Sequence, residues 1–237
     1  MATTTHSMDA VILVGGFGTR LKSVSNGTPK SLMNVGDGVF LDVLLHRLVN
    51  LNLKRVFLSV HYGAQQFIDY AAKADFQFEL IPVVEPEPLG TGGAIAYLLS
   101  KYNISSPFFV MNGDSHSNID LNEMRVAFDE TEVKAMLGLS EVENVFRYGS
   151  VELENTRVIC FREKGETGRG LINNGVYLFQ PELFDGLTGA LSLEADILPA
   201  LVEHNELDGF KVVDDSFIDI GVPDDYLKFS AKGVTSE

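Results

Sequence analysis

Residues 11–30 read VILVGGFGTRLKSVSNGTPK, an apolar run that opens onto three glycines, an arginine and a later Pro-Lys pair. The β-branched start is typical of a buried strand, and the glycines are typical of a tight strand-to-helix turn. Without Cβ atoms, such a turn lets backbone N–H groups approach a phosphate closely. Residues 10–36 contain no acidic side chain, whereas Arg20, Lys22 and Lys30 fall there. The stretch therefore predicts the first strand of an α/β sheet and a pocket for a small anionic ligand, although a turn without a ligand would show the same pattern.

The rest of the composition has the opposite charge. There are 33 Asp and Glu residues against 18 Lys and Arg residues, which leaves a formal net charge of -15. Such a surface repels polyanions, so we expect neither a nucleic-acid nor an anionic-membrane partner. The single cysteine, Cys160, excludes an intrachain disulfide and is expected to be a small hydrophobic core residue. No signal peptide or long apolar run is recognisable, and we expect a cytoplasmic protein.

Apolar runs of strand length alternate with stretches of helical period along the chain. This rhythm predicts an α/β fold with a Rossmann-like mixed, mainly parallel sheet flanked by helices. We expect one domain over residues 1–237. Predicted strands lie at residues 10–14, 56–60, 78–84, 108–111, 135–139, 149–153, 157–161 and 171–179, and apolar spacing predicts helices over residues 40–51 and 94–99.

A second glycine cluster, EPEPLGTGGA at residues 85–94, follows the third predicted strand. Gly90, Gly92 and Gly93 leave bare backbone where a helix begins, against which a flat base could lie. Glu85 or Glu87 could accept hydrogen bonds from base N–H groups, a pattern that suits guanine. Acidic residues that complement the dipole of a helix N-terminus are the competing interpretation.

Two aspartates come directly after apolar runs, Asp114 in FFVMNGDSH and Asp219 in FIDIGVPDDY. Mg²⁺ typically takes one or two carboxylates together with substrate phosphates. The pair therefore predicts a shared Mg²⁺ if the fold brings the two strand ends together, although each aspartate alone is also a common cap or turn residue. We expect His116, two residues after Asp114, to line the pocket wall rather than to act as a catalyst.

The motifs VGGFGTRL with PK, EPEPLGTGGA, NGD, FREK with INNGVYLF, SLEADIL and FIDIGVPDDY, taken in this order, resemble those of the sugar nucleotidyltransferases. Members of this family join a nucleoside triphosphate to a sugar 1-phosphate. The resemblance covers about residues 9–229, and GTRLKS, EPLGTGGAI, RYGSV and GLINNGVYL are most similar to the branch that acts on D-glycero-α-D-manno-heptose 1-phosphate with GTP. It implies a nucleotide-binding half over about residues 9–115 and a sugar-phosphate-binding half over about 116–237. The implied partners are GTP, or another nucleoside triphosphate, and a sugar 1-phosphate, with Mg²⁺ as cofactor; a homo-oligomer is compatible with this.

The resemblance also implies roles for single residues. Arg20 and Lys30 would bind and orient the triphosphate, and Lys164 would bind the phosphate of the sugar phosphate. Asp114 and Asp219 would hold the metal ion and complete the catalytic set. The remaining nucleotide-binding positions are implied to be Val14, Gly15, Gly16, Gly18, Thr19, Glu85, Glu87, Gly90, Thr91, Asn112 and Gly113. The remaining sugar-phosphate-binding positions are implied to be Glu163, Asn174, Gly175 and Glu194.

Three alternatives stay open at this point. A mannose 1-phosphate guanylyltransferase or an amino-sugar 1-phosphate uridylyltransferase would differ only in base and sugar contacts. A nucleotide-sensing domain without turnover is disfavoured because five residues are retained together, namely Arg20, Lys30, Asp114, Lys164 and Asp219. A nicotinamide-dependent dehydrogenase would need a third motif glycine where Leu21 stands.

Overall fold

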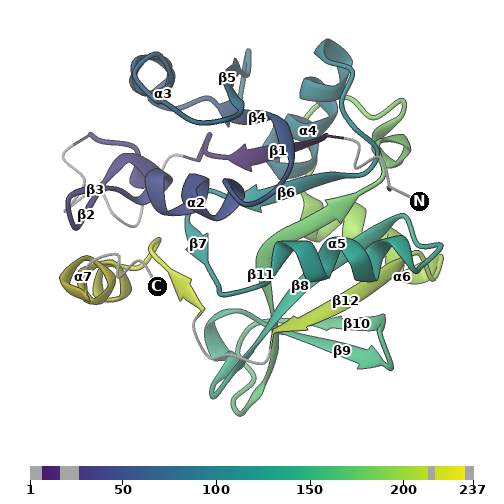
Figure 1. Ribbon diagram of the computed structural model, residues 1–237. Coiled ribbons are helices and arrows are strands. Elements are labelled where there is room, and N and C mark those ends of the chain that lie inside the picture. The colour runs from purple at the N-terminus through teal and green to yellow at the C-terminus, as the bar shows by residue number, and fades with distance from the viewer. Residues whose placement is uncertain (1–6, 17–26, 213–216, 233–237) are drawn as a thin grey trace.

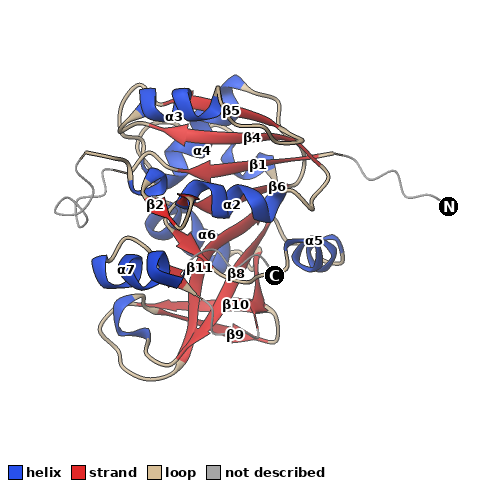
Figure 2. Ribbon diagram, turned by 60° about the vertical axis from the view of Figure 1, so that its left-hand side comes forward, coloured by secondary structure: helices blue, strands red, loops and turns tan. Residues whose placement is uncertain are grey.

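The structure is a computed structural model that describes residues 7–16, 27–212 and 217–232. A nine-stranded sheet in the order β5-β4-β1-β6-β11-β8-β12-β10-β9 runs through the molecule, from β5 at the top of Figure 2 to β9 at the bottom. Only β11 and β10 run opposite to the other strands of this sheet. The predicted Rossmann-like, mixed and mainly parallel sheet is therefore confirmed. The strands are β1 (Met8–Leu13), β4 (Leu53–Val60), β5 (Glu79–Val84), β6 (Phe108–Asn112), β8 (Ala135–Val142), β9 (Ser150–Glu154), β10 (Arg157–Arg162), β11 (Gly170–Phe179) and β12 (Leu207–Val212).

Helices cover both faces of this sheet (Figure 1). They are α2 (Phe40–Leu48), α3 (Ala64–Ala71), α4 (Gly90–Lys101), α5 (Leu121–Asp129), α6 (Leu198–Glu203) and α7 (Pro223–Lys232), with short turns η2 (Lys30–Leu32), η3 (Val145–Arg147), η4 (Pro181–Phe184) and η5 (Leu193–Ile197). Apolar side chains of α2, α3 and α5 form one buried cluster with one face of the sheet, and those of α4 and α6 form a second with the other face. In β1, Ala10 and Ile12 belong to the first cluster and Val11 to the second, which explains why this strand is apolar without alternation. None of the helices in the described ranges is long and apolar enough to cross a membrane.

Two small sheets complete the architecture. Strand β2 (Asn34–Val35) pairs with β3 (Gly38–Val39), and β7 (Ser115–His116) pairs with β13 (Ile218–Asp219). The second pair brings the end of the chain back beside β6. Helix α7 then packs on α2, where the rings of Phe40 and Phe229 meet edge to face with centroids 5.7 Å apart.

The predicted strands all occur, with shifted ends. Strand β8 continues to Val142 because it pairs along its length with β11 and β12. The helix predicted to reach residue 51 ends at Leu48. Strand β12 was not predicted, and neither were α3, α5, α6 and α7. The division into nucleotide-binding and sugar-phosphate-binding halves stays a prediction.

Candidate active site

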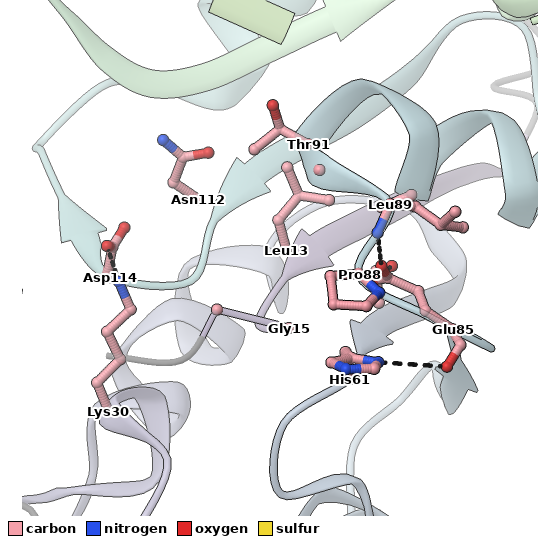
Figure 3. A pocket seen from close by; sticks show the side chains of 14 residues that line it. Leu13, Gly15, Lys30, His61, Glu85, Pro88, Leu89, Thr91, Asn112 and Asp114 are labelled. Carbon is pink, nitrogen blue, oxygen red and sulfur yellow. Dashed lines mark hydrogen bonds and ion pairs between the residues drawn. The ribbon is translucent and has the colours of Figure 1, made fainter. Parts of the chain in front are cut away.

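A cavity of about 330 Å³ lies where β1, β4, β5 and β6 end. Ligands of parallel sheets bind at this edge, because the loops that leave for the helices open there. Figure 3 shows the cavity with Glu85 and Leu89 at one end and Lys30 and Asp114 at the other. The lining residues are Leu13, Gly15, Gly16, Lys30, Ser59, His61, Glu85, Pro88, Leu89, Gly90, Thr91, Ala94, Asn112 and Asp114.

Glu85 is a buried carboxylate that the protein holds from both sides. The Ser59 hydroxyl donates to its Oε1 at 3.0 Å, and the Leu89 backbone N–H donates to its Oε2 at 3.2 Å. A Cβ on Gly15 would lie 3.0 Å from Oε1, so a larger residue there would press on the carboxylate. Burial raises the pKa of Glu85, while the hydrogen bonds from Leu89 and Ser59 and the neighbouring His61 act in the opposite direction. The site thus contains an oriented carboxyl group that takes up a proton more readily than an exposed glutamate does.

Lys30 and Asp114 form an ion pair at the other end of the cavity, in which the lysine Nζ donates to Oδ2 (Figure 3). The next residue, Ser31, is buried and donates from its hydroxyl to the Gly113 carbonyl at 2.5 Å, which ties η2 to the turn after β6. A Cβ on Gly113 would lie 2.5 Å from the Val14 side chain, so this turn requires glycine. The cation and the carboxylate are therefore placed together by backbone geometry.

Asp219 reaches the same region through the pairing of β13 with β7. Asp219 stands opposite Ser115, and the Ile220 N–H donates to the Asp114 carbonyl at 2.9 Å. The Oδ1 of Asp219 accepts the Gly221 N–H at 2.8 Å, which orients the carboxylate. Carboxylates are the ligand type that Mg²⁺ takes from proteins, with substrate phosphates and water in its other positions, so the chemistry of Asp114 and Asp219 suits this ion. Within the described residues, no group of three or more His, Cys, Asp or Glu side chains is placed to hold a metal ion.

The glycines at the start of α4 pack closely against another segment. The N–H groups of Gly92 and Gly93 donate to the Leu191 carbonyl at 2.8 and 3.1 Å. A Cβ on Gly93 would lie 2.2 Å from the Gly189 carbonyl oxygen. The expectation that these glycines leave backbone bare for a base is therefore wrong for Gly92 and Gly93, because the chain around residue 190 uses that space. Gly90 does line the cavity.

Asn174 and Gly175 lie in β11 beside the cavity. Asn174 is buried, and its amide donates to the Ser140 hydroxyl at 3.3 Å and accepts the Val176 N–H at 3.1 Å, so this side chain is engaged within the sheet. Gly175 has a φ of +79°, and a Cβ there would lie 2.8 Å from the Asn112 amide nitrogen. Gly175 thus allows β11 to approach Asn112 closely.

Several implied site residues do not line the cavity. Glu163 and Lys164 are exposed in the loop after β10, and Glu87 is exposed in the loop before α4. Glu194 does not line it either, but accepts a hydrogen bond from Thr91, which does. Three further implied residues lie outside the described part of the chain: Gly18, Thr19 and Arg20.

Other predictions need correction or addition. His116 does not line the cavity but lies beside Phe229 of α7, with ring centroids 5.9 Å apart, and burial lowers the pKa of its imidazole to about 4. Cys160 is only partly buried, because it belongs to the β9–β10 hairpin at the edge of the sheet. Ser59 was missed as a site residue, although it is the one polar residue in the apolar run VFLSV that ends β4.

Known proteins resemble the chain over almost its whole length. The family described as nucleotidyl transferase matches residues 9–236. The chain is 36% identical over 225 residues to the D-glycero-alpha-D-manno-heptose 1-phosphate guanylyltransferase of Campylobacter jejuni, which covers 94% of this chain and 98% of that protein. It is 32% identical over 233 residues to the mannose-1-phosphate guanylyltransferase of Mycobacterium tuberculosis, which covers 96% of this chain but less than two thirds, 65%, of that protein.

A solved structure shows the same fold. The crystal structure of HddC from Yersinia pseudotuberculosis superposes with a TM-score of 0.83 at 34% identity, over 95% of this chain and 99% of that chain. HddC complexed with GMP-PN superposes over the same shares, with a TM-score of 0.81 and 34% identity.

Proposed function

Because this chain belongs to the nucleotidyl transferase family, we propose that it transfers a guanylyl group from GTP to a sugar 1-phosphate, D-glycero-α-D-manno-heptose 1-phosphate being the preferred acceptor. The products are GDP-heptose and pyrophosphate. The observation that carries the proposal is the end-to-end match to the heptose 1-phosphate enzyme of Campylobacter jejuni, 98% of which is covered. The match to HddC, a protein solved with GMP-PN, supports the choice of the guanine nucleotide.

Glu85 supports guanine as the base. Guanine presents adjacent N1–H and N2–H₂ donors, which one carboxylate can accept together. Glu85 is buried at one end of the cavity, and the hydrogen bonds from Ser59 and Leu89 already orient both of its oxygens. Adenine lacks this donor pair, so the carboxylate would lose the two further hydrogen bonds that guanine supplies, which costs about 1–3 kcal/mol.

In the proposed reaction, a phosphate oxygen of the sugar 1-phosphate attacks the α-phosphorus of GTP. A new P–O bond forms as the bond from the α-phosphorus to the bridging oxygen breaks, and that electron pair leaves with pyrophosphate. The attacking oxygen is already ionised near neutral pH, so no general base is needed. Catalysis then rests on positioning and on fixed positive charge where negative charge accumulates.

The proposed role of each residue follows from its position. Asp114 and Asp219 would hold Mg²⁺, which when bound neutralises phosphate charge. Lys30, which contacts Asp114 and lines the cavity, would bind the triphosphate, with Arg20 as a second cation. Lys164 is exposed outside the cavity, where a loop lysine can meet the incoming sugar phosphate.

A pyrophosphate-release assay with four nucleoside triphosphates and a panel of sugar 1-phosphates tests this function. We expect GTP with the heptose 1-phosphate to give the highest kcat/KM in the presence of Mg²⁺. Glu85→Gln should lower kcat/KM for GTP by about tenfold to a hundredfold, because a carboxylate that accepts two donors is lost. Glu87→Gln is the matched control, since Glu87 is exposed and away from the cavity lining. Equal use of UTP by the unsubstituted protein would refute guanylyl transfer.

A second candidate is guanylyl transfer to mannose 1-phosphate. It is favoured by the 32% identity to the mannose-1-phosphate guanylyltransferase of Mycobacterium tuberculosis. The two acceptors are compared by competition in one assay with GTP. A higher kcat/KM for mannose 1-phosphate than for the heptose 1-phosphate would replace the first candidate by the second.

A further inference from the structure

Two segments far apart in the chain are joined beside the cavity. One is the first turn of α4, which follows the Glu85 loop, and the other is residues 189–194, which include the start of η5. The Leu191 N–H donates to the Leu89 carbonyl at 2.9 Å, and the Leu191 carbonyl accepts the N–H groups of Gly92 and Gly93. A Cβ on Gly90 would lie 2.5 Å from the same carbonyl oxygen. The two segments are therefore fixed to each other through their backbones.

Thr91 adds a side-chain connection at this junction. Its hydroxyl accepts the Leu193 N–H at 2.8 Å and lies 3.1 Å from the Glu194 Oε2. A hydroxyl has one proton to donate, and the Leu193 N–H occupies its acceptor side. The Thr91 proton is therefore directed to the Glu194 carboxylate, while the same threonine lines the cavity.

The Glu194 carboxylate is held by hydroxyls on both oxygens. Ser192 donates to Oε2 at 3.1 Å, and Tyr177 donates to Oε1 at 3.4 Å. The Tyr177 ring is fully buried, and the Asn173 amide donates to its oxygen at 2.9 Å, which leaves the phenol proton for Glu194. Burial is also the largest cause that raises the pKa of Tyr177, so the phenol stays a donor. Of these donors, only Thr91 comes from the nucleotide half of the chain.

We propose that Thr91 is a positioning residue that couples the two substrate sites of the transferase. It holds the Glu194 carboxylate, to which the family resemblance assigns a contact with the sugar phosphate, and a nucleotide bound in the cavity restrains the Thr91 side chain and so the carboxylate. The proposal rests on the function given above and goes beyond it, because it predicts that the two substrates bind synergistically through one hydroxyl. Coupling of this kind requires a shared element that both ligands affect. Thr91 lines the cavity proposed for the nucleotide, and it contacts Glu194, which the family resemblance assigns to the sugar phosphate.

Binding of the heptose 1-phosphate and of mannose 1-phosphate, measured by calorimetry with and without a non-hydrolysable GTP analogue, tests the coupling. In the unsubstituted protein we expect the analogue to tighten sugar phosphate binding about fivefold to tenfold. Thr91→Val keeps the shape but removes the hydroxyl, so the tightening should disappear and KM for the sugar phosphate should rise about fivefold to tenfold. Because coupling is reciprocal, binding of the analogue should weaken only when sugar phosphate is present, and it should change by less than about threefold in its absence. Thr91→Ser retains the hydroxyl and should restore both values.

Tyr177→Phe is the matched control on the other oxygen of the same carboxylate. It removes a donor that belongs to the sugar-phosphate half, so it should weaken sugar phosphate binding equally with and without the analogue. Thermal melting of each variant identifies any loss of folding, and Glu194→Gln, which removes the charge that accepts the Thr91 hydroxyl, keeps the test valid if Thr91→Val is unstable.

Two results would overturn the inference. Either Thr91→Val raises KM for GTP alone, or Glu194→Gln leaves sugar phosphate binding and its tightening by the analogue unchanged. In both cases guanylyl transfer by the unsubstituted protein stands, because pyrophosphate release with GTP is measured separately. If pyrophosphate is never released, the proposed function fails, whereas the calorimetric coupling can still be measured.

Discussion

The Glu85 carboxyl lies at one end of the cavity, where burial raises its pKa above the ordinary value of 4.5. Burial of the ionised Glu85 side chain lowers the stability of the folded protein, but it also places a hydrogen-bond acceptor in the cavity. The folded protein holds the Glu85 proton more tightly than the unfolded chain does. The stability that this tighter proton binding contributes is therefore fully present below the ordinary pKa of Glu85. It is lost as the pH rises through the raised pKa of the folded state.

Glu85→Gln should for this reason stabilise the ligand-free protein at pH 7. Glutamine does not titrate, so the gain in free energy of unfolding should shrink as the pH falls towards 4, where Glu85 becomes protonated. Urea unfolding of both proteins between pH 4 and 8 measures the difference. Glu87→Gln, at an exposed position, is the matched control. A gain for Glu85→Gln that is the same at every pH would contradict the explanation.

Each of the two aspartates, Asp114 and Asp219, should be needed for turnover. Asp114→Asn or Asp219→Asn should reduce turnover by roughly a hundredfold, because loss of a charged metal ligand removes about 3 kcal/mol of transition-state stabilisation. Folding should be retained, since asparagine keeps an oxygen that can accept the Gly221 N–H at position 219. Steady-state rates across a Mg²⁺ titration provide the measurement. Near-normal turnover of Asp219→Asn at limiting Mg²⁺ would remove that residue from the site.

At the scale of elements, helix α4 is positioned by its own first turn. The turn has to lie against residues 189–191, and backbone atoms fill the space where side chains would project. Gly93 is the most restricted of these glycines, because its Cβ would lie 2.2 Å from the Gly189 carbonyl oxygen.

Gly93→Ala should therefore destabilise the protein by about 2–4 kcal/mol, since a backbone oxygen cannot move as a long side chain can. Gly16→Ala is a suitable control for stability, because the nearest atom to its Cβ would be the Lys30 Cε at 3.9 Å. We expect the control to change the free energy of unfolding by less than about 0.5 kcal/mol. Denaturant unfolding measures both, and equal losses would show that α4 tolerates displacement from the 189–191 segment.

At the scale of the whole molecule, Asp9 joins parts of the sheet that are distant in sequence. Its buried carboxylate accepts Arg55 Nε at 2.9 Å and Nη2 at 2.6 Å from β4, and the Ser105 N–H at 2.9 Å from the loop before β6. The hydrogen bond with Asp9 is the largest cause that raises the pKa of Arg55. This contact fixes β1 between its two neighbours at the end of the sheet opposite the cavity.

Asp9→Ala should cost about 3–5 kcal/mol, because Arg55 Nε and the Ser105 N–H lose their acceptor and the guanidinium keeps only the Asn103 carbonyl. The exposed pair between Arg162 and Glu152 is the matched comparison, and Arg162→Ala should cost less than about 1 kcal/mol. Thermal and urea unfolding measure both variants. A similar small loss at Asp9 would mean that apolar burial alone holds β1 in place.

The amino-acid sequence by itself determined the mixed α/β sheet and the edge of the sheet at which the cavity lies. Apolar runs of strand length and glycines directly after them are local features, so they are readable without knowing which segments meet. The Glu85 loop and Asp114 were identified in this way, because each follows its strand within a few residues. Asp219 was identified from the same local pattern, and the family resemblance implied the same role for it as for Asp114.

Only the tertiary structure decided how these groups combine. The contact of Thr91 with Glu194, the hydrogen bond from Ser59 to Glu85 and the use of the Gly92 N–H by another segment all join residues that no local pattern connects. The exposed position of Lys164, outside the cavity, also became visible only there. The physical reason is that strand formation depends on neighbours along the chain, whereas a hydrogen bond between distant segments depends on sheet order and on helix packing, which the whole sequence sets together.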